Sequence, residues 1–321
     1  MARRSAIGAV VLALAIGCTA CTAGSAGGHP PGPASAGDAG PGVITVGSFD
    51  FPESVLLARL YAGALSARGY PVRVRPDLGS RELVEPALMT GLVQLVPEYS
   101  GSALEFVSLG RAHATADVAA TAAALANWMA ARGIVTARPA TAQDANAIVV
   151  TGATASRYRL HTISDVARAA PGLVFGGPPE CPERPDCLPG LRRTYGLRFR
   201  AFAALDAGGP LTRQALEVGD IGAALLFTTD PAIKARHLVE LADNRRLQPA
   251  ENVIPVLRRA TANRYGPGLL AVLDAVSVRL STDALTALNA QVEQDGRNPR
   301  AVARSWLREQ GLLAAGRHER R

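Results

Sequence analysis

The sequence predicts an α/β protein with two lobes, each built on its own α/β sheet, joined by a hinge. Short apolar runs alternate with segments of helical periodicity from residue 43 onward. After an alanine-rich stretch the alternation starts again near Ala147, and it ends in a mainly helical tail. Two such units within 321 residues match two domains of modest size. We therefore expect a clamshell whose ligand site lies where strand ends and helix starts face the cleft.

The first unit has three apolar runs separated by two helical segments. The strands are expected at 43–46, 72–74 and 93–96. The helices between them begin near Pro52 and Ser80, and Gly69 and Gly91 end them. An alanine-rich helix follows at about 115–132. Because strands alternate with helices, the sheet is expected to be parallel.

The second unit repeats this architecture without a sequence repeat. Strands are expected at 147–150, 173–175, 199–203 and 221–226, and helices at 163–169, 188–195 and 211–218. A last strand at 253–256 returns to the first sheet in this prediction, and the tail from 257 to 313 is mainly helical. The predicted boundaries are 43–141 plus 248–314 for lobe 1, 142–247 for lobe 2 and 315–321 for a polar tail, with crossovers near 140–144 and 244–249.

Residues 1–18 have the form of a lipoprotein signal peptide. Arg3 and Arg4 precede an apolar run that is shorter than the roughly 20 residues of a membrane-spanning helix. The run ends in Ala-Ile-Gly-Cys, which resembles a bacterial lipoprotein cleavage box with Cys18 as the lipidated residue and Cys21 as the alternative. Residues 19–42, mostly Gly, Pro, Ala and Ser, then form a flexible tether. The predicted location is extracytoplasmic, with a lipid anchor on the outer face of the cytoplasmic membrane.

The charge of the chain does not indicate a nucleic-acid partner. The formal net charge is +7, but the arginines are scattered among acidic residues and Lys234 is the only lysine. Aromatic residues make up only 5% of the chain, so each aromatic near a candidate site carries extra weight.

Apart from Cys18 and Cys21, the chain has two cysteines, Cys181 and Cys187. In an oxidising compartment a disulfide is the expected state. A loop this short gains only about 2–2.5 kcal/mol from the bond, so its main effect is local and fixes Arg184. A metal site is the rival interpretation, but no histidine lies nearby.

No enzyme motif is present in the sequence. A Gly-x-Ser-x-Gly elbow, a phosphate-binding loop with lysine and a His-Glu-x-x-His helix are all lacking. The five histidines are widely spaced and form no ligand pattern. We therefore predict a protein that is not an enzyme and that uses no cofactor or metal.

Five segments at strand ends carry polar and aromatic residues. They lie at 47–53, 78–82, 96–104, 181–187 and 226–230. Each alone is compatible with an ordinary helix cap or turn. Five such turns at corresponding ends of two sheets favour a binding cleft.

Together these segments resemble the substrate-binding proteins of osmoprotectant ABC importers, which bind glycine betaine, choline and carnitine. The family pattern reads Gly-Ser-Lys-x-Phe-x-Glu, Leu-Gly-(Ser/Thr), Glu-Tyr-Thr-Gly-Thr-Ala, Phe-Gly…Arg-Pro-Asp-x-Leu-Pro and Tyr-Thr-Thr-Asp. The matching residues here lie at 47–53, 78–80, 98–103, 175–176 with 184–189, and 227–230. The resemblance spans 43–313. It implies a type II periplasmic-binding-protein fold and a monomer that delivers a small solute to ABC permease subunits with a cytoplasmic ATPase.

The resemblance also implies roles for particular residues. A quaternary ammonium group has no N–H to donate, so aromatic rings hold it by cation–π attraction of about 2 kcal/mol or more when desolvated. Tyr99 matches a cage tyrosine, and Ser102 matches a hydroxyl donor. Arg184 matches the residue that binds the ligand carboxylate, and Asp144 falls near a cleft position.

Four positions depart from the family pattern. The other cage tyrosines fall at Asn146, Phe227 and Glu251, and a lysine found in some members falls at Phe49. Phe227 keeps a ring face, Asn146 does not, and Glu251 could attract a cation or bond a ligand hydroxyl. The aromatic cage is therefore expected to be eroded. The ligand stays open between betaine, choline, a related solute and a molecule without an ammonium group.

The predicted fold is also compatible with two other functions. A sensor or adhesion module could employ the same clamshell for a different small ligand, and an exported α/β enzyme is a third class. Permease and ATPase genes beside this one would favour import, and a sensor kinase gene would favour the first alternative.

Overall fold

The computed structural model describes residues 42–313. The predictions for 1–41 and 314–321 lie outside the described residues; they include the signal peptide, the lipidated Cys18 or Cys21 and the polar tail. Within 42–313 no helix has the length and apolar character needed to cross a membrane.

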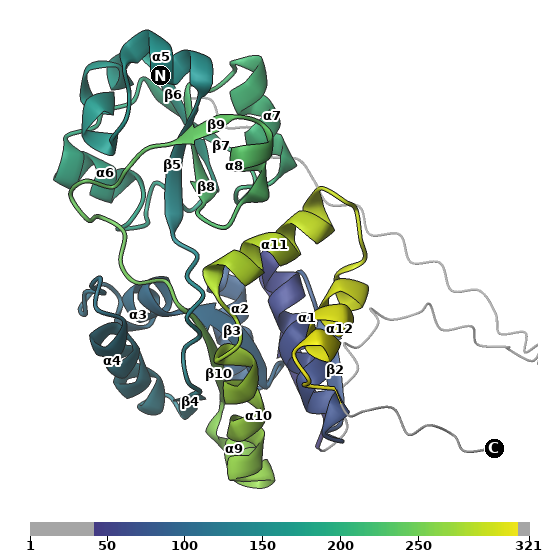
Figure 1. Ribbon diagram of the computed structural model, residues 1–321. Coiled ribbons are helices and arrows are strands. Elements are labelled where there is room, and N and C mark those ends of the chain that lie inside the picture. Colours follow the sequence, from purple (N-terminus) through teal and green to yellow (C-terminus); the bar gives the residue numbers. More distant parts are fainter. Residues whose placement is uncertain (1–41, 314–321) are drawn as a thin grey trace, which may run out of the picture. The chain divides into compact units, whose positions relative to one another are not determined.

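The first sheet has the strand order β2-β1-β3-β10-β4 (Figure 1). Its strands are β1 (Ile44–Gly47), β2 (Val72–Arg75), β3 (Leu95–Tyr99), β4 (Ile134–Thr136) and β10 (Val253–Arg258). All residues of β1 and β3 are buried, as expected for central strands covered on both faces. The last predicted strand does return to this sheet, as β10.

Eight helices accompany the first sheet in the described chain. They are α1 (Pro52–Ala67), α2 (Arg81–Thr90), α3 (Ser100–Ser108), α4 (Val118–Ala130), α9 (Arg259–Tyr265), α10 (Pro267–Ser277), α11 (Thr282–Glu293) and α12 (Pro299–Glu309). Helix α1 packs against α10 and α12, while α3 packs against α4 (Figure 1). Helix α11 contacts α1 and α12 and also α8 of the second lobe.

The second sheet has the order β7-β6-β8-β5-β9. Its strands are β5 (Asn146–Thr151), β6 (Val174–Gly177), β7 (Ala201–Ala204), β8 (Ala223–Phe227) and β9 (Leu238–Glu240). The helices around it are α5 (Gly152–Tyr158), α6 (Leu188–Tyr195), α7 (Pro210–Val218) and α8 (Pro231–Ala235), with 3₁₀ helices at Ile163–Arg168 and Ala170–Gly172.

Both sheets follow one plan, and the parallel arrangement predicted for the first three strands is confirmed. Strands β2, β1 and β3 are parallel, as are β7, β6 and β8. The fourth strand, β10 or β5, is antiparallel to both of its neighbours. Each of these strands enters its sheet directly from a crossover between the lobes, so no helix precedes it to reverse its direction.

Several helix predictions are corrected by local contacts. The alanine-rich helix begins at Val118 because the Asp117 carboxylate caps it through the N–H of Ala120. Ser80 occupies the N-cap position of α2, but its hydroxyl donates to the Glu82 carboxylate instead of capping the helix. The segment predicted as a helix at 163–169 is a short 3₁₀ helix.

The two crossovers between the lobes run side by side. Gln143 and Asn252 form an antiparallel bridge, and the N–H of Asp144 donates to the carbonyl of Glu251 at 3.0 Å. The predicted crossovers at 140–144 and 244–249 fall in these connections, while the residue limits of the lobes stay a prediction. The bridge fixes Asp144 and Glu251 next to each other.

Candidate functional site

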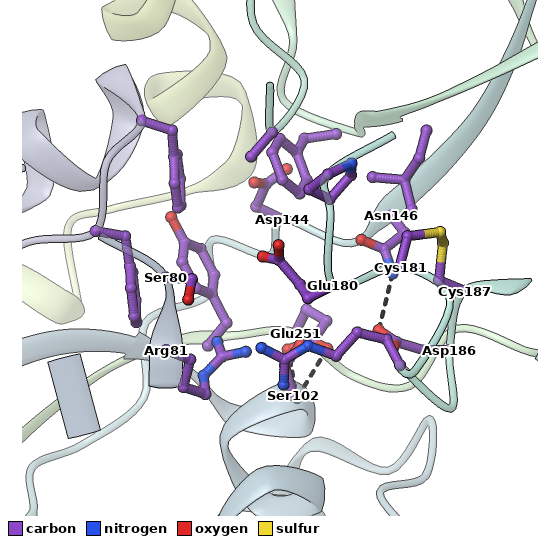
Figure 2. A pocket seen from close by; sticks show the side chains of 18 of the residues that line it. Ser80, Arg81, Ser102, Asp144, Asn146, Glu180, Cys181, Asp186, Cys187 and Glu251 are labelled. Atoms are coloured by element: carbon purple, nitrogen blue, oxygen red, sulfur yellow. Dashed lines mark hydrogen bonds between the residues drawn. A yellow bond between two sulfur atoms is a disulfide. The ribbon is translucent and has the colours of Figure 1, made fainter. Parts of the chain in front are cut away.

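One cavity in the described part of the chain is lined by all eight residues that the sequence predicts for a ligand site. They are Phe49, Tyr99, Ser102, Asp144, Asn146, Arg184, Phe227 and Glu251. Figure 2 shows the cavity from close by. The lining also includes Asp50, Phe51, Arg81, Glu180 and Asp186, to which the sequence analysis assigned no role.

Strand ends deliver most of these side chains, as the topology requires. Tyr99 is the last residue of β3, and Phe49 follows β1 by two residues. Phe227 ends β8 of the second sheet, and Asn146 begins the antiparallel β5 beside it. The cavity therefore draws on both lobes.

Four aromatic rings form one side of the cavity, which we call the aromatic wall: Phe49, Phe51, Tyr99 and Phe227. Phe51 is its centre, because its ring centroid lies 5.9 Å from that of Phe49, 6.1 Å from that of Tyr99 and 5.5 Å from that of Phe227. All three pairs are stacked. The predicted erosion of the aromatic site is thus offset by Phe51, which lies two residues after the position of the family lysine.

A buried polar network lies behind the aromatic wall. The Tyr99 hydroxyl donates to Glu53 Oε1 at 2.7 Å, and Asn289 Nδ2 donates to Glu53 Oε2 at 2.5 Å. Thr229 Oγ1 lies 2.5 Å from Glu53 Oε2 and 2.8 Å from Asp144 Oδ1. A hydroxyl has a single hydrogen, so one of these two contacts requires a proton on a carboxyl group.

Asp144 is one of the two carboxyl groups in these contacts, and its pKa is shifted. Burial and the neighbouring charge of Glu53 raise the pKa of the Asp144 carboxyl well above its ordinary value. Burial also raises the pKa of the Tyr99 hydroxyl, and the Glu53 charge adds to the shift, so Tyr99 stays a hydrogen-bond donor. The network fixes the Tyr99 ring at the edge of the cavity.

The opposite side of the cavity is polar, and we call Arg81, Ser102, Arg184 and Glu251 the polar floor. Glu251 is 2% exposed and lies at the N-terminus of α3. Its carboxyl accepts from the N–H of Gly101 at 3.1 Å, from the N–H of Ser102 at 2.9 Å and from the Ser102 hydroxyl at 2.5 Å (Figure 2).

Gly101 makes this close approach to Glu251 feasible. A Cβ atom at position 101 would lie 2.6 Å from Pro249 Cγ and 3.0 Å from Glu251 Oε1. Any larger residue would push the crossover away from the start of α3. Burial, followed by the charge of Asp186, raises the pKa of the Glu251 carboxyl to about 8.

Arg81 lies over the Phe49 ring, with its central carbon 5.2 Å from the ring centroid. Its Nε and Nη2 atoms each donate to the Glu98 carboxylate at 2.9 Å. Glu98 is fully buried and also accepts from the N–H of Tyr99. The sequence predicts Arg81 only as part of a strand-end segment. In the structure its guanidinium is fixed by two hydrogen bonds to Glu98 and by the Phe49 ring.

Arg184 comes from the loop closed by the Cys181–Cys187 disulfide, which is present as predicted. Its Nη2 atom donates to Glu82 Oε1 at 2.8 Å, and its guanidinium lies 5.5 Å from the centroid of the Phe106 ring. Glu82 and Phe106 belong to the first lobe, so Arg184 joins the two lobes.

Asn146 stands where the family has a cage tyrosine, but its amide makes hydrogen bonds within the chain. Its Nδ2 atom donates to Asp186 Oδ2 at 2.8 Å and to Gln248 Oε1 at 3.2 Å (Figure 2). Phe49, at the position of the family lysine, is 4% exposed and packs into the aromatic wall.

Carboxyl groups outnumber cationic groups among the residues that line the cavity. Two arginines face five carboxyl groups, those of Asp50, Asp144, Glu180, Asp186 and Glu251. Rings together with carboxyl groups suit an organic cation. Within 42–313 no group of three or more His, Cys, Asp or Glu side chains is arranged to hold a metal ion.

Two α/β sheets, paired crossovers and a cavity lined from both sides define the class of two-lobed solute-binding proteins. Residues 42–309 match the family of substrate-binding domains of ABC-type glycine betaine transport systems. The chain belongs to this family, whose members are extracytoplasmic transport proteins and not enzymes. They bind small solutes and work with permease components.

Related proteins carry names from the same family. A glycine-betaine-binding protein of Pseudomonas aeruginosa is 31% identical over 284 residues, covering 85% of this chain and 89% of the relative. The glycine betaine-binding protein YehZ of Escherichia coli is 25% identical over 277 residues, covering 84% of this chain and 90% of the relative. A solved glycine betaine/carnitine/choline ABC transporter structure is 21% identical with a TM-score of 0.67, covering 84% of this chain and all of that chain, and it supports the fold.

Proposed function

We propose that the protein captures a small quaternary ammonium solute in this cavity and hands it to an ABC permease. The observation that carries the proposal is the aromatic wall, in which Phe51 is stacked with three other rings beside an excess of carboxyl groups. Ring faces attract a cation that has no N–H to donate, and nearby carboxyl groups strengthen the attraction. The names of the two relatives support this ligand class for the present chain.

Calorimetric titration of the purified protein tests the ligand class. Choline, glycine betaine and carnitine are compared with 3,3-dimethyl-1-butanol, the neutral carbon analogue of choline. Choline and its analogue have nearly the same shape, so the difference isolates the charge. We expect the analogue to bind at least about tenfold more weakly than choline, because cation–π attraction is lost. Equal affinities, or no binding of any quaternary ammonium compound, would refute the proposal.

The proposal includes a lipid anchor on the outer face of the cytoplasmic membrane, with Cys18 as the modified residue. Expression of the full chain in a bacterial host tests it. Cys18→Ser should move the protein from the membrane fraction to the soluble fraction, while Cys21→Ser should not. The reverse pattern assigns the anchor to Cys21, and an unchanged distribution in both variants contradicts lipidation.

A further inference from the structure

The anion-binding groups of the polar floor are each already paired with a carboxyl group of the chain itself. The start of α3 and the Ser102 hydroxyl donate to Glu251. The Arg81 guanidinium is held by Glu98, and that of Arg184 by Glu82. A ligand carboxylate entering the floor therefore competes with carboxyl groups of the chain for these donors.

Glu251 is the firmest of these internal partners. It is buried, its two oxygens accept from Gly101 and Ser102, and its carbonyl accepts from the N–H of Asp144. The backbone crowding at Gly101 leaves the crossover little room to move. Helix N-termini attract carboxylates because their first N–H groups lack partners within the helix. In α3 this position is filled by Glu251.

The two arginines cannot readily take over the role of these donors. Arg81 uses two of its three nitrogens for Glu98, a carboxylate without any exposed surface. Arg184 is held by Glu82, which is itself oriented by the Ser80 hydroxyl at 2.7 Å. Any anion placed beside these guanidiniums also lies near Glu251, Asp186 and Glu180 of the same cavity.

We propose that Glu251 is a specificity-determining residue that fills the carboxylate position of the site with a group of the chain itself. The cavity then selects quaternary ammonium ligands without a carboxylate, such as choline, over zwitterions such as glycine betaine. This inference rests on the proposed function, because it presupposes that the aromatic wall binds the ammonium group. It assigns the preference between two ligands of that class to one side chain.

The experiment measures the ratio of choline affinity to glycine betaine affinity in matched proteins. The purified protein is expected to bind choline at least about tenfold more tightly, since Glu251 occupies the space and the N–H donors that a ligand carboxylate would need. Glu251→Ala frees the N–H groups of Gly101 and Ser102 and should shift the ratio toward glycine betaine by at least about tenfold. Free acetate should compete with glycine betaine in this variant, because it can occupy the vacated position.

Two further variants keep the test decisive. Glu217→Ala is the control, since Glu217 pairs with Arg236 on the exposed surface and does not line the cavity. It should leave the ratio unchanged. If Glu251→Ala fails to fold, Glu251→Ser also removes the side-chain carboxyl from the N–H groups of Gly101 and Ser102, and it should move the ratio in the same direction.

The outcomes separate the two proposals. Binding of both ligands with glycine betaine equal to or tighter than choline overturns the specificity inference and leaves the proposed function standing. An unchanged ratio in the Glu251 variants does the same. Binding of neither ligand overturns the proposed function and, with it, the inference.

Discussion

The aromatic wall and the polar floor face the same cavity but differ in how their groups are satisfied. In the wall, the rings of Phe51 and Phe227 are held by stacking and have no hydrogen-bonding groups to satisfy, while Phe49 is packed between Phe51 and the guanidinium of Arg81. In the floor, the guanidinium of Arg81 and the carboxyl of Glu251 have strong partners within the chain. The wall is built for a ligand, while the floor is largely complete without one.

Because of this difference, substitutions in the floor and in the wall should affect different properties of the protein. Breaking a buried charge pair costs folding free energy because an uncompensated charge is left behind. Removing a ring that faces a cavity costs ligand affinity and little else. Floor variants should therefore lose stability and wall variants should lose binding, and each prediction below tests one side of that contrast.

The largest effect is expected for Arg81→Gln. It leaves the fully buried Glu98 without its bidentate partner, and Glu85 lies close enough that the charge of Glu98 contributes to raising its pKa. We expect a loss of about 3–5 kcal/mol in the free energy of unfolding, measured by denaturant titration. Arg236→Gln breaks an exposed pair with Glu217 and serves as the control, with an expected loss below about 1 kcal/mol. Similar losses in the two variants would contradict the contrast between wall and floor.

Phe51→Leu should have the next largest effect, on binding rather than on folding. The substitution keeps an apolar side chain but removes the ring at the centre of the wall. We expect choline affinity to fall by roughly 30-fold, which corresponds to about 2 kcal/mol of cation–π attraction.

A matched ring outside the cavity provides the control for Phe51. Phe199 stacks on Phe175 with centroids 4.7 Å apart and does not line the cavity. Phe199→Leu should lower the unfolding free energy and leave choline affinity unchanged. If both variants lose affinity equally, the loss reflects general destabilisation and the wall has no special role.

The sequence predicts many of the residues that line the cavity, but it does not predict the central ring of the aromatic wall. All eight predicted residues line the cavity, because strand ends in an α/β sheet converge at one edge. Phe51 matches the phenylalanine of the family pattern at 47–53, but the pattern alone assigns it no contact with a ligand. The scarcity of aromatic residues was a usable signal for it, since Phe51 lies in the same strand-end segment.

Three other features of the structure cannot be predicted from the residues near them in the sequence. Asn289 lies inside α11 and contacts Glu53, 236 positions away, so no pattern around it indicates a role. The antiparallel direction of β5 and β10 depends on where the crossovers run. Helix α3 begins at Ser100, directly after β3. No turn residues separate the two elements, so the sequence does not show where the strand ends and this nine-residue helix begins.

The disulfide closes a short loop of the second lobe that carries a residue of the floor, and its removal should have a moderate effect. Cys181 and Cys187 close the loop that carries Arg184 and Asp186. The double variant with serine at both positions should lose about 2 kcal/mol in unfolding free energy, the value expected for so short a loop. Choline affinity should stay unchanged, because the floor does not supply the main attraction for the cation. A large loss of choline affinity in a folded double variant would show that the loop contributes to the ligand contacts.

The pH dependence of stability tests the polar floor through the protonation of Glu251. Burial and Asp186 raise the pKa of Glu251 to about 8, against contacts with Ser102 and the charge of Arg81 that lower it. The native state therefore holds a proton that the unfolded chain has already released above its ordinary pKa of about 4.3. Since the native state binds more protons in that range, the Glu251 contribution lowers stability progressively as the pH rises from about 5 to 8, and the decline ends above the folded pKa.

Glu251→Gln isolates this contribution from the other titrating groups. The amide cannot ionise, so the variant should lose less stability than the unmodified protein between pH 5.5 and 8.5, with melting temperatures that diverge by roughly 6–12 °C over that range. Thermal unfolding followed by circular dichroism at several pH values gives both slopes. Parallel slopes would mean that Glu251 is ionised throughout, with Ser102 and the start of α3 outweighing burial. The floor would then present a full negative charge to the cavity at every pH tested, and choline binding should be independent of pH over the same interval.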